Sequence, residues 1–169
     1  MKINHFLKYT SLFLIGALAG NAFAFVMGMG SVMEKLSATS YIAFHESMQR
    51  SFLSWTPLLC MVVLFKLVTH LLMLRKQWKH LEFFFVLFTL LCVVNDLLIT
   101  WTGFVPLNQL IRVWGFQGPP NDWEAIRSQW LNLMYWRCSV LTAGFSFLIL
   151  SALIRRTESP ISKDVAVAV

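Results

Sequence analysis

The chain has 169 residues, of which 57% are hydrophobic, 15% aromatic and only 13% charged, and its mean hydropathy is +0.65. Soluble domains carry about 25% charged residues, so this composition excludes an ordinary soluble enzyme, a disordered chain and a disulfide-rich secreted domain. The formal net charge is +6, but no basic stripe interleaved with aromatic residues is available to bind phosphates. The composition therefore indicates an integral membrane protein, and we expect no nucleic-acid partner.

Four apolar stretches are long enough to cross the hydrocarbon core of a bilayer, which takes about 20 residues of helix. They are residues 9–30, 52–74, 82–105 and 131–154. Because the segments between them are short, we predict an all-α fold, with one four-transmembrane-helix bundle over residues 1–155. The remaining residues, 156–169, are predicted to form a disordered cytoplasmic tail.

Basic residues divide unequally between the two sides of these spans. Eight lie on one side, namely Lys2, Lys8, Arg75, Lys76, Lys79, Arg155, Arg156 and Lys163. Four lie on the other side, namely Lys35, Arg50, Arg112 and Arg127. The positive-inside rule then places both termini in the cytoplasm and the two longer loops outside. We therefore predict a multi-pass protein of the plasma or inner membrane, in contact with the lipid bilayer.

The first span has a second interpretation as a secretory signal peptide. Lys2 and Lys8 precede an apolar run over residues 12–18, and the triplet at 22–24 is a possible A-x-A cleavage site. Cleavage would leave three spans. The apolar stretch continues without a break through Met29, which is longer than a typical signal-peptide core, so we retain four spans.

Polar side chains at membrane depth are costly and usually face the interior of a bundle. Asp96 in the third span and Arg137 in the fourth are candidates for an ion pair. Side chains tilt toward the N-terminus of their own helix, however, which separates these two in depth on antiparallel spans. We therefore expect Asp96 to be held by Asn21, Thr100 or water, or to be partly protonated, with a direct pair as the alternative. For Asn21 and Asn95 the other interpretation is hydrogen bonding that holds helices together.

Lys66 and His70 lie four residues apart on one face of the second span. The simpler interpretation is a lysine that extends to the membrane surface and a histidine near a helix end. The alternative is a haem or metal ligand, which needs a second histidine at matching depth. The other histidines, His5, His45 and His80, do not provide one.

The cysteines give no sign of redox or metal chemistry. Cys60, Cys92 and Cys138 lie in three different spans, and no C-x-x-C pair is present. A di-iron centre needs several carboxylates, and only Asp96 lies deep in a span. We therefore predict no metal site and no cofactor.

The approach to the second span, residues 41–50, contains no helix breaker and is predicted to extend that helix outward until Pro57 kinks it. His45, Gln49 and Phe52 would then share one face. Because histidine titrates near neutral pH, His45 is a candidate general base at the mouth of the bundle. The alternative is a solvated amphipathic turn.

The second half of the chain resembles a known family. The relevant residues are Val105-Pro106-Leu107-Asn108 at the end of the third span, Asp122-Trp123, Arg127-Ser128-Gln129-Trp130 and Arg137. In this order they resemble the anthrone-oxygenase-like family of small four-helix membrane proteins, most of which have no assigned function. The resemblance covers roughly residues 10–155, but its motifs are confined to 106–108 and 127–137. The chain departs from the family at Met134, where many relatives have a polar residue.

This resemblance implies a polar pocket near one membrane face and, in a minority of relatives, cofactor-independent oxidation of an anthrone to an anthraquinone. We therefore expect an outer-half pocket that binds a small hydrophobic molecule, aromatic or phenolic. The expected catalytic residues are His45, Asp96 and Arg137, and the expected substrate-binding residues are Gln49, Asn108, Arg127 and Trp130. His45 or Asp96 would remove a proton, Arg137 would stabilise the oxyanion, and the substrate would react directly with oxygen.

Whether the protein is an enzyme, here a monooxygenase, stays open at this point. The alternative is a non-catalytic membrane protein that binds lipid or a partner transmembrane helix. Gly16 and Gly20 form a G-x-x-x-G motif, which is compatible with helix association and with a homo-oligomer. A small permease is a third interpretation, but four spans without an internal repeat make a poor transporter.

Overall fold

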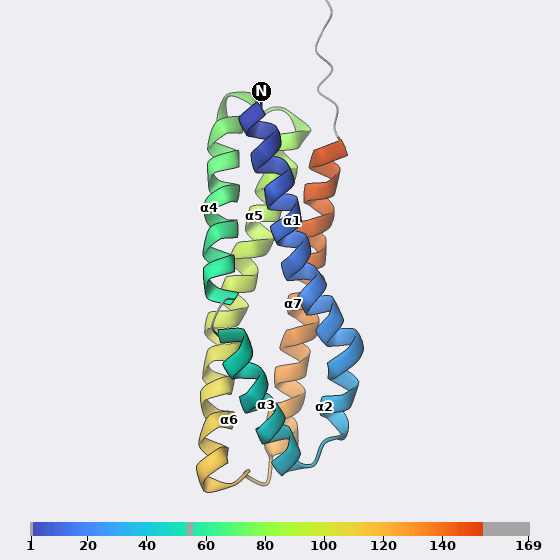
Figure 1. Cartoon of the computed structure of the whole chain (residues 1–169), viewed down its shortest axis with the longest axis vertical. Helices are drawn as coiled ribbons and strands as arrows, with labels where there is room; N and C mark the ends of the chain where they lie inside the picture. Colours follow the sequence, from blue (N-terminus) through green and yellow to red (C-terminus); the bar gives the residue numbers. More distant parts are fainter. Residues whose placement is uncertain (1, 54–55, 154–169) are drawn as a thin grey trace, which may run out of the picture.

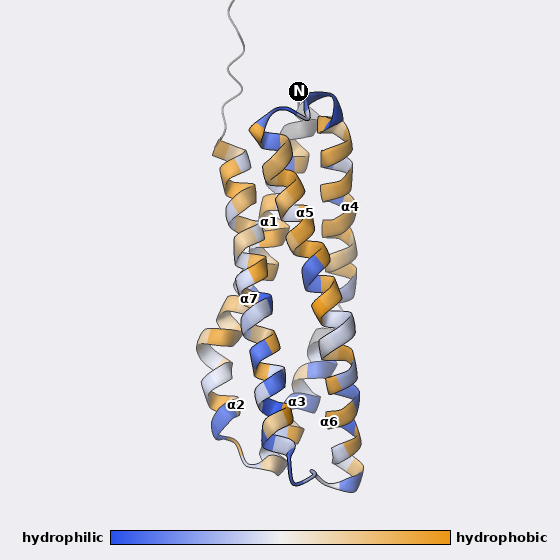
Figure 2. Ribbon diagram, turned by 180° about the vertical axis from the view of Figure 1, so that it is seen from behind, coloured by the Kyte–Doolittle hydropathy of each residue, from blue (hydrophilic) through white to orange (hydrophobic). Residues whose placement is uncertain are grey.

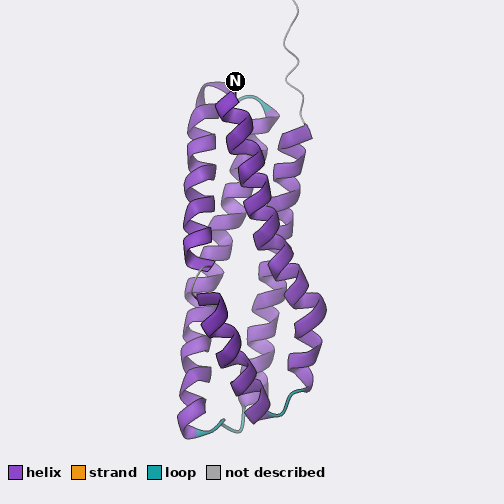
Figure 3. Ribbon diagram, in the orientation of Figure 1, coloured by secondary structure: helices purple, strands orange, loops and turns teal. Residues whose placement is uncertain are grey.

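The computed structural model describes residues 2–53 and 56–153, with side chains described for 6–51 and 56–153 (Figure 1). The described residues are helical apart from short connections at the ends of the molecule, and no strand occurs among them (Figure 3). Four of their helical segments are long and apolar enough to cross a membrane: Phe6–Lys35, Thr56–Gln77, Leu81–Gln117 and Trp123–Leu153. The prediction of an all-α bundle with four candidate spans is confirmed. The predicted tail lies outside the described residues, and the side of the membrane that holds the termini stays a prediction.

The elements follow one another with few interruptions. The first continuous helical segment consists of α1 (Lys2–Ala24), the π-helical segment η1 (Phe25–Gly30) and α2 (Ser31–Lys35). It is followed by α3 (Ala38–Leu53), α4 (Thr56–Leu74) and the short 3-10 turn η2 (Arg75–Gln77). The next continuous segment consists of α5 (Leu81–Ile99), the π-helical segment η3 (Thr100–Phe104) and α6 (Val105–Gln117). The last helix is α7 (Trp123–Leu153), with 31 residues.

The structure corrects two predicted helix ends. The third span does not stop at residue 105, because the helix runs through Pro106 to Gln117. Proline is tolerated inside this continuous helix because it lies next to the π-helical segment η3, where the changed winding accommodates the ring and the missing N–H. The last helix begins at Trp123 rather than at residue 131. The turn between them follows Gly118, whose φ of 82° is a left-handed conformation that favours glycine.

Residues 38–53 also differ from the prediction of a continuous extension of the second span. They form the separate helix α3, which packs against α6, while α4 begins at Thr56. The predicted helical character of this segment is confirmed. The predicted partner Phe52 lies outside the residues whose side chains are described.

Two hydrophobic clusters divide the bundle along its long axis. The first is formed by α1, α4, α5 and the second half of α7, and includes Ile15, Val63 and Leu141. The second is formed by η1, α2, α3, α6 and the first half of α7, and includes Tyr41 and Trp130. We call these parts the α4 half and the α3 half. Figure 2 shows that hydrophilic residues are more frequent in the α3 half, while the helices of the α4 half are mostly hydrophobic.

Close approach of α5 to α7 fixes the α4 half. A Cβ atom on Gly144 would lie 3.0 Å from the Cβ of Cys92, so glycine allows the two backbones to come together. The hydroxyl of Thr89 donates a hydrogen bond of 3.0 Å to the carbonyl of Gly144. In α1, a Cβ on Gly16 would lie 3.0 Å from the ring of Phe145, whereas Gly20 has no atom within 4 Å. Gly16, the first glycine of the G-x-x-x-G motif, therefore faces α7 of the same chain.

Candidate functional site

A groove of about 300 Å³ lies between α3 and α6, and we call it the α3–α6 groove. Its lining residues are Ile42, His45, Glu46, Gln49 and Arg50 from α3, and Ile111 and Arg112 from α6. The α3 residues recur at intervals of three, four and seven, so they form one helical stripe. The prediction that His45 and Gln49 share a face is confirmed.

His45 is the buried polar residue of this lining, with 1% of its surface exposed. Its ring lies against the edge of Trp130, with centroids 5.3 Å apart, and tilted against Tyr41 at 5.8 Å. Burial lowers the pKa of His45 to about 4, and a side-chain hydrogen bond with Asn108 opposes part of this effect. His45 is therefore neutral at pH 7, and its Nε2 atom has no hydrogen-bond partner among the described residues.

The Nε2 atom of His45 is a candidate hydrogen-bond atom beside the groove. It is buried, it has no hydrogen-bond partner among the described residues, and it belongs to a residue that lines the groove. In a neutral imidazole one nitrogen is an acceptor, which is Nε2 when the proton lies on Nδ1.

Asn108 connects His45 to α7. Its Oδ1 atom accepts a hydrogen bond of 2.8 Å from Nε1 of Trp130. Trp130 in turn makes edge contacts with Phe25 and Phe104, at centroid distances of 5.5 and 5.3 Å. Three of the predicted site residues, His45, Asn108 and Trp130, are thus in mutual contact.

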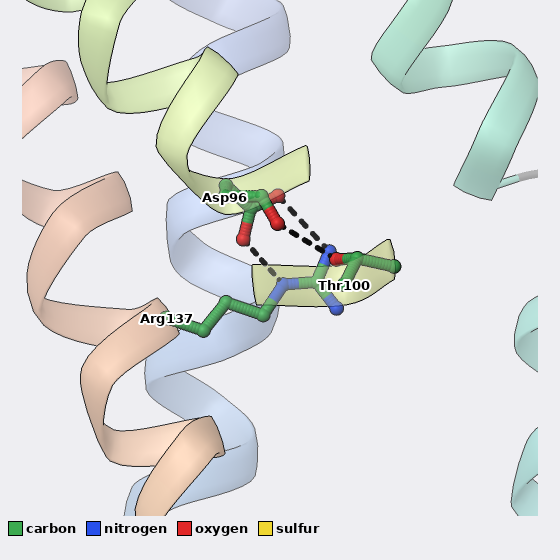
Figure 4. Close-up of polar contacts among 3 residues, drawn as sticks. All are labelled: Asp96, Thr100 and Arg137. Atoms are coloured by element: carbon green, nitrogen blue, oxygen red, sulfur yellow. Dashed lines mark hydrogen bonds and ion pairs between the residues drawn. The ribbon is translucent and has the colours of Figure 1, made fainter. Parts of the chain in front are cut away.

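Asp96 and Arg137 form a direct ion pair in the interior of the bundle (Figure 4). Arg137 Nε donates to Asp96 Oδ1 at 2.7 Å, and Nη2 donates to Oδ2 at 3.3 Å. The direct pair, predicted as the alternative, is therefore present, and the expectation that the side chain of Asn21 or Thr100 holds the carboxylate is wrong. Asn21 is exposed, and the Thr100 hydroxyl donates to the backbone carbonyl of Asp96 at 2.8 Å. The long arginine side chain spans the depth difference that the tilt of the Cα–Cβ bonds creates.

This ion pair does not line the α3–α6 groove, but a chain of aromatic rings connects the two. The Arg137 guanidinium lies over the ring of Phe104, 5.8 Å from its centroid. Phe104 contacts Trp130, which contacts His45. The structure therefore separates the predicted catalytic residues into two places, with His45 in the groove and Asp96 and Arg137 behind the aromatic layer.

Arg127 lies in a third place, at the C-terminal end of α2. Its Nη1 atom donates to the carbonyls of Met33 and Leu36, at 3.4 and 3.1 Å. Its guanidinium group also lies over the ring of Trp123, 4.6 Å from the centroid. The last carbonyls of a helix have no partner within the helix, so Arg127 satisfies them and attaches α2 to α7.

Several residues of the site were not predicted. The groove rim carries Glu46, Arg50 and Arg112, of which Glu46 and Arg50 form an ion pair. The arginines beside Glu46 lower the pKa of its carboxyl group. Tyr41 is fully buried beside His45, and burial raises the pKa of its hydroxyl, which has no described partner. The recurrence of polar residues at 45, 46, 49 and 50 is the signal that would have found the α3 side of this rim.

A second polar cluster lies in the α4 half. Lys8 Nζ is 2.8 Å from Glu82 Oε1, and His70 Nε2 is 3.9 Å from the same oxygen. His70 lies near the end of α4, as predicted, and is fully buried. Lys66 donates to the Thr10 hydroxyl at 2.8 Å. Among the described residues, no group of three or more His, Cys, Asp or Glu side chains is arranged to hold a metal ion.

Comparison with protein-family models, curated proteins and solved structures finds no match. The resemblance to the anthrone-oxygenase-like family therefore stays a prediction.

Proposed function

We propose that this membrane protein binds a small hydroxyaromatic molecule in the α3–α6 groove, with the ligand hydroxyl donating to His45 Nε2. The observation that carries the proposal is the unpartnered Nε2 of a buried, neutral histidine that lines a groove of about 300 Å³. A pocket of this size is at the lower end of the range for small-molecule sites.

The unpartnered Nε2 of His45 makes the groove selective for ligands that carry a hydroxyl group. A buried acceptor without a partner costs about 1–3 kcal/mol, which a ligand O–H group would recover. The side chains of Ile42 and Ile111 supply apolar contact for the ring of the ligand. An aromatic molecule without a hydroxyl would gain the apolar contact but leave Nε2 unpaired.

The proposal favours binding over oxidation of the ligand. A histidine with a pKa of about 4 is neutral at pH 7 but is a weak base toward a phenol or an anthrone, whose pKa is far higher. Arg137 pairs with Asp96 and does not line the groove, so it is not placed to stabilise an oxyanion there. The oxygenase chemistry that the family resemblance implies therefore lacks its base and its oxyanion partner in this arrangement.

Ligand binding by the detergent-purified protein tests the proposal. Titration with 1-naphthol and with 1-methylnaphthalene, followed by equilibrium dialysis, compares two ligands that differ in the hydroxyl group. We expect tighter binding of 1-naphthol and a loss of at least about tenfold in H45F, equivalent to about 1.4 kcal/mol. The matched control is H80F, at an exposed histidine far from the groove.

Equal binding of the two ligands, or unchanged 1-naphthol binding in H45F, would contradict the proposal. Oxidation is tested on the same samples with anthrone and an oxygen electrode. The reaction anthrone + O₂ → anthraquinone + H₂O consumes one O₂ for each anthrone. Oxygen uptake that exceeds the spontaneous rate in the native protein and is lost in H45F would show catalysis. The oxygenase function would then replace the binding proposal.

A further inference from the structure

The length of the third helical segment limits how the chain can sit in the bilayer, independently of the groove and of its ligand. The continuous helix Leu81–Gln117 has 37 residues and is therefore about 55 Å long. The hydrocarbon core of a bilayer is only about 30 Å thick. Part of the molecule must project from the membrane, be tilted strongly, or distort the bilayer.

Exposed charges mark which part projects. In the α3 half the exposed charged residues are Glu34, Lys35, Glu46, Arg50, Arg112, Asp122 and Glu124. At the opposite end of the bundle, Arg75, Lys76 and Lys79 are exposed around the turn between α4 and α5. Between these two groups, no described side chain that is charged is also exposed. Lys8, Glu82, Asp96 and Arg137 are paired inside the bundle, and half-buried Lys66 donates to Thr10.

Exposed tryptophans lie at both limits of this uncharged band. Trp78, 57% exposed, lies in the turn between α4 and α5. Trp101 and Trp136 are 78% and 59% exposed and adjoin Thr100 and Arg137, at the junction of the two halves. Tryptophan is enriched at the interfaces between hydrocarbon and headgroups. The helix from Leu81 to Trp101 rises about 30 Å, which matches the hydrocarbon thickness.

We infer that the bilayer covers the α4 half alone, with hydrocarbon from about Leu81 to Trp101, and that the α3 half projects from the membrane. Leu91 then faces the lipid at the bilayer midplane. The Asp96–Arg137 pair lies about two turns of helix or less below the hydrocarbon boundary. Arg112 lies about 16 Å beyond Trp101 along the helix, farther than the depth of the headgroup layer, so the α3–α6 groove opens into water.

The rival arrangement centres the bilayer on the middle of the long helix, near Ile99. It would place exposed Leu98 at the midplane and would move Trp101 and the ion pair into the centre of the hydrocarbon. The exposed tryptophans would then face lipid tails rather than headgroups. The two arrangements differ by about 12 Å along the helix, which depth measurements resolve.

Nitroxide labels on the exposed face of the long helix test the inference. The labels replace Leu91, Leu98, Leu110 and Phe116 one at a time, in full-length protein reconstituted into phosphatidylcholine vesicles. The native cysteines are replaced by alanine, and melting of each variant checks that it is folded. The depth of each label follows from its relative collision rates with oxygen and with a water-soluble nickel chelate.

We expect the greatest depth at Leu91, a shallower position at Leu98, and full access to the nickel chelate at Leu110 and Phe116. A maximum at Leu98, or a label at Phe116 shielded from the chelate, would overturn the inference. Cys92 packs against Gly144, so its removal changes the packing of the bundle. A second measurement therefore uses the chain with its cysteines intact. The tryptophan fluorescence of the native protein and of W101F is then measured in lipids brominated at successive acyl positions. The difference between the two proteins gives the quenching of Trp101. Strongest quenching by bromines nearest the headgroup supports the inference, and strongest quenching by bromines near the chain ends overturns it.

Discussion

Arg137 donates two hydrogen bonds to the carboxylate of Asp96, at 2.7 and 3.3 Å, and thereby joins α7 to α5 where the two halves of the molecule meet. Asp96 lies in the last turn of α5, directly before the π-helical segment η3. Thr100, the first residue of η3, returns a hydrogen bond to the Asp96 carbonyl. The ion pair therefore lies one turn before the point at which the long helix changes from α-helical to π-helical winding.

Removal of one partner of this pair should destabilise the protein more than removal of both. R137M leaves the Asp96 carboxylate buried without its counter-ion, and such changes cost about 3–5 kcal/mol. The double variant D96L/R137M removes both charges and should recover part of that loss. The measurement is the free energy of unfolding of each variant in a detergent–SDS titration. A double variant that is as unstable as the sum of the two single variants would show that the pair has no coupling energy.

Sequence alone predicted the features that depend on a single helix. The shared face of His45 and Gln49 follows from helical periodicity, which the structure preserves because α3 stays regular through both residues. The long helix through Pro106 was not predicted because a proline usually ends a helix, and the sequence does not reveal the π-helical segment beside Pro106 that lets this one continue.

Contacts between helices were harder to predict. The Lys8–Glu82 pair and the position of Arg112 beside His45 depend on which helices are neighbours, and periodicity carries no such information. The Asp96–Arg137 pair was judged from the direction of the Cα–Cβ bonds alone. The Cα–Cβ direction fixes only the first bond of a side chain, whereas arginine has several further bonds with which to change direction.

The burial of His45 should make stability depend on pH. Its pKa is about 4 in the folded protein and about 6.5 in the unfolded chain, so between these values the unfolded chain binds a proton that the folded chain does not. The free energy of unfolding should therefore fall as the pH falls from 6.5 to 4, by up to about 3 kcal/mol from this residue. Unfolding curves across this range, for the native protein and for H45Q, isolate the effect because the two proteins differ only at residue 45. If the free energies of unfolding of the two proteins changed in parallel with pH, the lowered pKa of His45 would be refuted.

Arg112 should favour ligands that carry an acidic group. The rim holds two arginines and one glutamate, so Arg50 and Glu46 neutralise each other and Arg112 leaves a net positive charge. If the groove binds hydroxyaromatic molecules, 6-hydroxy-2-naphthoate should bind more tightly than 2-naphthol at low salt, and the difference should shrink at high salt. R112Q should abolish the difference without weakening 2-naphthol, and R75Q at the opposite end of the bundle is the control. Equal affinities for both ligands in the native protein would exclude a role for this charge, while binding of 2-naphthol alone would still support the groove.

Arg127 should stabilise the protein through the shape of its guanidinium group and not through its charge alone. It donates to two carbonyls of the α2 end and lies on the ring of Trp123, contacts that a lysine ammonium group cannot make together. We expect R127K to lose about 1–3 kcal/mol of unfolding free energy, since helix-end carbonyls lose their partner. Hydrogen exchange at the amides of α2 gives the local effect, with K35R as a matched exposed control. Unchanged exchange in R127K would show that charge alone holds α2 in place.

The glycines of the bundle provide a matched pair of tests for the packing of α5 on α7. G144A adds a Cβ that would lie 3.0 Å from the Cβ of Cys92, so the helices must separate, and overpacking of this kind costs about 1–3 kcal/mol. G20A adds the same atom where nothing lies within 4 Å, and alanine is the better helix former by about 1 kcal/mol. We therefore expect opposite signs, with G144A less stable and G20A as stable as the native protein or more so. In the double variant C92A/G144A the obstructing Cβ remains, because alanine also has one, so the loss should persist. Rescue in C92G/G144A, compared with the cost of C92G alone, would identify that single Cβ–Cβ contact as the reason for glycine at position 144.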